Sequence, residues 1–144
     1  MLVRVTVAVS AASLMAVGCS SGESNSGSDA EGPGVRAVAE DFLADLKVGA
    51  WNAAYSRMHG RLQQRCGDAE GLRRAVESHG QPASWTLRDP KTGENSVTIT
   101  GAFEPKYDPE VAHDPNTIVE MSLDKVDGQW QVWDWAVRNQ SVCG

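Results

Sequence analysis

Hydrophobic and polar positions follow helical spacing in the region that begins at residue 35. The apolar members of the first stripe are Val35, Val38, Phe42, Leu43 and Leu46. Apolar residues three and four positions apart, with charged residues on the other faces, predict an amphipathic helix that packs on a core. Gly49 is its expected C-cap, because glycine takes the left-handed conformation without steric cost.

Two further helices are predicted before residue 82. The second begins near Ala50 and carries the apolar stripe Trp51, Ala54, Tyr55, Met58 and Leu62. The third begins after Asp68 as its N-cap and stops at Gly80 and Pro82, which are typical helix-ending residues.

From residue 83 onward the spacing changes from helical to alternating. A short strand is predicted at 85–88 and a longer one at Val97–Phe103, where apolar and polar residues alternate. Two more strands, Ile118–Val126 and Gln129–Arg138, flank Asp127-Gly128, a dipeptide typical of two-residue hairpin turns. Helices followed by antiparallel strands predict an α+β fold.

Two passages resemble the NTF2-like superfamily, the cystatin-like cone domains named after nuclear transport factor 2. One is Phe42–Leu46 followed by Gly49–Tyr55, and the other is Asp127–Trp133. The resemblance implies N-terminal helices packed on a curved antiparallel sheet, in one domain at 35–144. The resemblance does not predict a particular activity, because that superfamily contains isomerases, dehydratases, transport factors and binding domains.

The N-terminal segment has the pattern of an export signal. Arg4 precedes an apolar run from Val5 to Val17, which is shorter than the about 20 residues that cross a bilayer. The run Ala16-Val17-Gly18-Cys19 resembles the lipobox of bacterial lipoproteins, with alanine where leucine is most usual. The resemblance implies removal of residues 1–18 and acylation of Cys19. An ordinary secretory signal with a chance cysteine is the alternative.

Composition separates a polar tail from the domain. Residues 19–34 contain no apolar side chain larger than alanine beyond Cys19 and Pro33, so we expect a flexible tether. Only Arg4 among the 13 lysines and arginines lies in the signal, and the 19 carboxylates all follow it, so the mature chain carries a net charge of −7. This charge argues against nucleic-acid partners, which need a basic patch. Membrane contact is therefore expected through the lipid alone.

Cys66 and Cys143 are the two cysteines that remain when Cys19 carries lipid. An even number of cysteines in an exported chain favours a disulfide between them. Two free thiols or a metal pair are the alternatives. The chain has three histidines and no C-x-x-C spacing, so no zinc site, other metal or cofactor is predicted.

Asp134 is the one candidate for a catalytic residue. A two-residue turn that pairs Leu123 with Val132 would place Asp134 opposite Met121 and Val119 opposite Ala136. Asp134 would then lie among apolar side chains if that face lines the cone. The resemblance implies an Asp or His inside the cone as general base, with its pKa set by the apolar wall. A hydrogen-bonded or solvated aspartate is the alternative.

Tyr55, Trp133 and Trp135 are the candidates for ligand or partner contact. Alternation places Trp133 and Trp135 on the face opposite Trp130 and Val132. That face is either covered by another element or exposed, and exposed aromatic side chains would mark a binding surface. Tyr55 lies on a helical stripe, where a role in the core is the alternative.

Two charged clusters complete the candidate sites. Arg57, Arg61 and Arg65 share one face if the second helix is continuous. They form either a solvated face or a patch for an acidic partner or polymer. The segment 106–114 contains three carboxylates and a histidine, but it lacks the turn glycine of calcium loops, so a solvated acidic loop is expected.

The sequence predicts a lipid-anchored protein on the extracytoplasmic face of a cell membrane. Its domain is expected to bind a small apolar ligand or another envelope protein. A small-molecule isomerase, dehydratase or hydrolase that uses Asp134 is the alternative. The ligand, the partner and the formation of a homodimer stay open.

Overall fold

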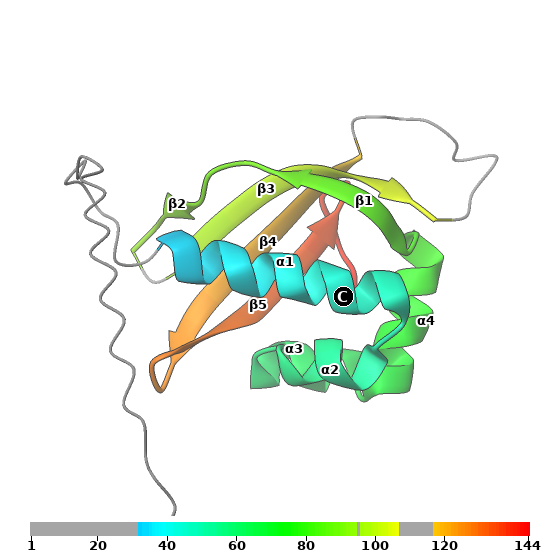
Figure 1. The fold of residues 1–144 in the computed structure, drawn as a ribbon. Helices are drawn as coiled ribbons and strands as arrows, with labels where there is room; N and C mark the ends of the chain where they lie inside the picture. Colours follow the sequence, from blue (N-terminus) through cyan, green and yellow to red (C-terminus); the bar gives the residue numbers. More distant parts are fainter. Residues whose placement is uncertain (1–31, 95, 107–116) are drawn as a thin grey trace, which may run out of the picture.

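Helix α1 lies across a curved antiparallel sheet, and three shorter helices pack beside it (Figure 1). The computed structural model describes residues 32–94, 96–106 and 117–144. Its helices are α1 (Gly32–Val48), α2 (Trp51–Ser56), α3 (Gly60–Cys66) and α4 (Ala69–His79). Its strands are β1 (Pro82–Leu87), β2 (Lys91–Thr92), β3 (Val97–Pro105), β4 (Ile118–Val126), β5 (Gln129–Val137) and β6 (Gln140–Ser141). The α+β prediction is confirmed.

The sheet is antiparallel throughout the described residues. Its strand order is β1-β3-β4-β5-β6, and the short β2 pairs with β3. The β4–β5 hairpin turns at Asp127 (φ 51°) and Gly128 (φ 81°). Positive φ at both central residues is what a type I′ turn requires, so the hairpin prediction is confirmed.

The expected helix ends are also present. The Gly49 amide donates to the Leu46 carbonyl at 3.2 Å, with φ at 74°. The Asp68 carboxylate accepts a hydrogen bond from the Gly71 amide at 2.7 Å and so caps α4. Helix α1 begins at Gly32, three residues before the expected start of the domain at Val35.

Large apolar side chains fill the space between α1 and the sheet. Phe42 of α1 meets Trp135 of β5 edge to face, with ring centroids 5.6 Å apart. Leu43, Leu46 and Met121 are fully buried beside them. Among the described residues, Thr117 is the one polar or charged residue in this buried set. The interior is therefore packed mainly by hydrocarbon and aromatic groups.

The prediction of one continuous second helix is wrong. Helix α2 ends at Ser56, and α3 begins at Gly60. Between them the chain runs along the edge of β5, where the His59 amide donates to the Val132 carbonyl at 2.8 Å and the Val132 amide donates to the Arg57 carbonyl at 3.0 Å. These bonds satisfy backbone groups of β5 at a position that β6 does not pair with, and the extended backbone that makes them interrupts the helix.

The predicted β4–β5 register holds only as far as Leu123 and Val132. Beyond this pair the register shifts by one residue, so Met121 pairs with Trp135 and Asp134 pairs with Ser122. Trp133 is the extra residue of a β-bulge. A one-residue slip exchanges the two faces of a strand. Trp135 therefore turns into the core and Asp134 turns away from it, which makes the predicted pairs Met121–Asp134 and Val119–Ala136 wrong.

Several predictions lie outside the described residues. These concern the signal at 1–18, Cys19 and its lipid, the tether as far as residue 31, and the acidic loop from 107 onward. None of the helices in the described part of the chain has the length and apolar character needed to cross a membrane.

Candidate functional site

The disulfide expected from the sequence is present between Cys66 and Cys143. Their Cα atoms lie 5.0 Å apart. Cys66 is the last residue of α3, so the bond fastens this helix to the C-terminal end of the chain. Gly71 makes the arrangement possible, because a Cβ atom at this position would lie 1.9 Å from the Cys66 carbonyl oxygen. The end of α3 is thus held closely against α4.

Asp134 of β5 contacts residues of α3 and β6 and so joins three elements. Its carboxylate accepts hydrogen bonds from the Arg65 guanidinium of α3 and, at 3.2 Å, from the Ser141 hydroxyl of β6. The Arg65 and Asp134 side chains are 41% and 30% exposed, so the ion pair stabilises the fold by only about 0–1 kcal/mol. The prediction that Asp134 could lie among apolar side chains is therefore wrong. The bulge turns this carboxylate toward Arg65 and Ser141.

An open hollow of about 460 Å³ lies between α3 and β5, and we call it the arginine hollow. It is lined by Arg61, Gln64, Arg65 and Trp133. Gln64 and Arg65 lie three and four residues after Arg61, so both are its neighbours on the surface of α3. Trp133 comes from the bulge and is 38% exposed. The broken helix and the β-bulge therefore bring these four side chains together.

The arginines of this region differ in their partners. Arg57, which the sequence grouped with Arg61 and Arg65, lies on the loop before α3 and pairs with Asp41 at 3.2 Å and with Asp45 at 2.7 Å. The guanidinium of Arg65 pairs with Asp134. Within the part of the chain that the structure describes, the Arg61 guanidinium makes no ion pair. The hollow therefore has one arginine whose charge no described carboxylate balances.

The candidate aromatic residues have separate roles. Trp135 is 2% exposed and belongs to the core, so its predicted place beside Trp133 on one face is wrong. The Tyr55 hydroxyl lies 2.9 Å from the Gly67 carbonyl oxygen and 3.2 Å from that of Gln63. Tyr55 thus ties α2 to the end of α3 and supports the arginine hollow without lining it. Trp133 is the candidate that reaches an open site.

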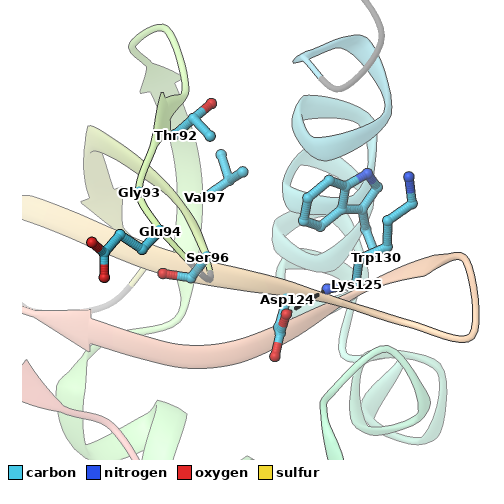
Figure 2. Close-up of a pocket in the computed structure, with 8 residues that line it drawn as sticks. All are labelled: Thr92, Gly93, Glu94, Ser96, Val97, Asp124, Lys125 and Trp130. Carbon is cyan, nitrogen blue, oxygen red and sulfur yellow. Dashed lines mark hydrogen bonds between the residues drawn. The ribbon is translucent and has the colours of Figure 1, made fainter.

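A second pocket, of about 210 Å³, lies near the start of α1 and was not foreseen from the sequence. Figure 2 shows its lining residues: Thr92, Gly93, Glu94, Ser96, Val97, Asp124, Lys125 and Trp130. The Lys125 amine lies 5.5 Å from the centroid of the Trp130 ring, and the Asp124 carboxylate accepts a hydrogen bond from the Lys125 amide at 2.8 Å. This pocket contains the cation of Lys125 and the carboxylates of Glu94 and Asp124. Because both signs of charge are present, the lining does not indicate a particular class of ligand.

Other ionisable groups of the described residues form surface contacts. A hydrogen bond from Arg73 lowers the pKa of the Glu70 carboxyl, and the same contact raises the pKa of Arg73. Both residues are on α4, one turn apart, away from the lining of the arginine hollow. No group of three metal-ligating side chains occurs in the described ranges. The arginine hollow is thus the described site whose chemistry is best defined.

Comparison with protein-family models finds no match, and a search of the curated proteins finds none either. The class of this protein is therefore defined by its observed architecture, an α+β domain with helices packed on an antiparallel sheet. The assignment of a function rests on the chemistry of the arginine hollow.

Proposed function

We propose that this chain is a lipoprotein, anchored by an acylated Cys19 on the extracytoplasmic face of a cell membrane, whose NTF2-like domain is a binding module. The export pattern before Cys19 supports the anchor. The Cys66–Cys143 disulfide supports an oxidising compartment. The long α1 across a curved sheet and the closing hairpin support the NTF2-like assignment.

The observation that carries the proposed function is the unbalanced Arg61 in an open hollow with an exposed tryptophan. A guanidinium presents several donors in a plane and forms strong hydrogen bonds with carboxylates and phosphates. An indole ring offers a flat apolar face. Together they suit a ligand or partner that carries an anionic group next to an apolar surface.

The surroundings of Asp134 favour binding over catalysis. A general base needs an available lone pair within reach of the substrate proton. The Asp134 carboxylate accepts hydrogen bonds from Arg65 and Ser141, both at Oδ1, and Asp134 lines neither the arginine hollow nor the pocket beside Trp130. Its observed contacts explain it as the residue that positions Arg65, and they give less support to an enzyme that uses it.

The two described pockets support a charged ligand more than an apolar one. The arginine hollow and the pocket beside Trp130 are both lined mainly by polar or charged side chains. The space between α1 and the sheet, where a cone would hold an apolar ligand, contains Phe42, Trp135 and Met121. We therefore place the binding surface of this domain on its outside.

Photo-crosslinking in the intact envelope tests this function. A photoreactive amino acid replaces Gln64 in the full chain, and the same amino acid replaces Thr86, an exposed residue of β1, as the matched control. The proposal expects a crosslinked product from position 64 that is absent from position 86 and that disappears with Arg61→Gln. Identical products from both positions, or none from position 64, would show that the hollow is not a binding site.

A further inference from the structure

The arginine hollow offers a single unbalanced positive charge. Asp134 neutralises Arg65 and fixes its guanidinium through a contact that Ser141 also shares. Arg61 stands one helical turn away with no carboxylate partner among the described residues. A site with one available cation matches one anionic group.

Trp133 supplies a flat wall beside that charge. It is 38% exposed, whereas the core residue Trp135 on the same strand is 2% exposed. The bulge holds Trp133 outward, because the residues on either side of it remain paired with β4. An indole face held in this way can stack on another flat, weakly polar surface. Aromatic rings and the C–H face of a pyranose sugar both have this form.

The amide of Gln64 favours a sugar over an aromatic ring as the surface that stacks on Trp133. This amide both donates and accepts hydrogen bonds, and it lines the hollow together with Arg61 and Arg65. Sugar hydroxyls need donors and acceptors together, whereas the edge of a hydrocarbon aromatic ring offers neither. The volume of about 460 Å³ also falls within the roughly 300–1,000 Å³ of small-ligand sites.

We infer that the arginine hollow binds one residue of an acidic sugar chain, with the anionic group on Arg61 and the sugar ring on Trp133. This inference rests on the proposed function, because it names the ligand class of the same site. Gln64 contacts the hydroxyls, and Arg65 positions the edge of the hollow through Asp134. The anionic group is a carboxylate or a phosphate, since a guanidinium binds both.

A nuclear magnetic resonance titration of the full lipidated chain in detergent micelles tests the inference. The readout is the indole N–H signal of Trp133, assigned by its loss in Trp133→Phe. The probes are a galacturonic acid trisaccharide, galactose 6-phosphate, the neutral galactose trisaccharide and triglutamate. We expect a saturable shift with either acidic sugar, and binding about tenfold weaker or more with the neutral sugar, because a charge-assisted hydrogen bond is lost.

Two variants separate a specific contact from net charge. Arg61→Gln should weaken the acidic sugar by about tenfold or more. Arg74→Gln removes the same charge from an exposed arginine of α4 outside the hollow, and it should change affinity by less than about twofold. Equal losses in the two variants would overturn the inference.

Two further outcomes distinguish the inference from the proposed function. If triglutamate shifts Trp133 and the sugars do not, the ligand class is wrong while the hollow remains a binding site. If no probe shifts the Trp133 signal but the photoreactive residue at position 64 still crosslinks specifically in the envelope, the sugar is likewise excluded and the proposed function stands. If both measurements are negative, both proposals fail.

Discussion

Removal of the Cys66–Cys143 disulfide should lower the stability of the domain by several kcal/mol. The bond joins residues 77 positions apart, and it holds α3, a helix of seven residues, to the end of the chain. Without the bond, α3 is too short to be stable on its own. Its remaining attachments are the buried side chain of Leu62 and the contacts of Tyr55 and Arg65.

The separation along the chain sets the size of the effect. In the chain-entropy model, closing a loop of 77 residues stabilises the folded state by about 4.5 kcal/mol, and native disulfides range down to about 2 kcal/mol. For a domain of about 110 residues, each kcal/mol corresponds to about 4 °C in Tm. The double variant Cys66→Ala/Cys143→Ala should therefore melt about 8–18 °C below the unsubstituted protein.

Thermal unfolding followed by circular dichroism measures this difference, with and without a reductant. The reductant should lower the Tm of the unsubstituted protein by a similar amount, and it should leave the double variant unchanged. A double variant that melts within about 2 °C of the unsubstituted protein would refute this reasoning. It would mean that α3 is held by its other contacts and that the loop-closure argument does not apply.

Three smaller perturbations test other parts of the chain. Cys19→Ala should leave the signal uncut and the chain without lipid, and an intact mass that shows normal processing would contradict the anchor. Asp68→Ala should cost about 1 kcal/mol through loss of the α4 cap, about 4 °C in Tm, whereas Asp68→Asn should retain most of the stability. Arg73 lowers the pKa of Glu70 below its ordinary 4.5, so this pair stabilises the fold above that pH and ceases to do so as the pH falls through the lowered value. Glu70→Gln should therefore flatten the decline of Tm below about pH 5, and an unchanged decline would assign it to other carboxylates.

Helices α1 and α4, their ends and the hairpin turn follow from the sequence because each depends on nearby residues. The stripe from Val35 to Leu46 predicts the buried face of α1, and the Asp68 carboxylate meets an amide three residues away. The Asp127-Gly128 turn needs only two residues with positive φ. The pairing of Cys66 with Cys143 was predictable for a different reason, since an even number of cysteines and the expected oxidising compartment left few alternatives.

The tertiary structure alone decided where the candidate site lies. The break at residues 57–59 results from backbone hydrogen bonds to Val132, which is more than 70 positions away in the chain. The bulge at Trp133 shifts the register of β5 by one residue, and this shift buries Trp135 beside Phe42. Neither event leaves a periodic signal, because each depends on groups that meet only after the chain folds. The arginine hollow needs both, since together they place Arg61 beside Trp133.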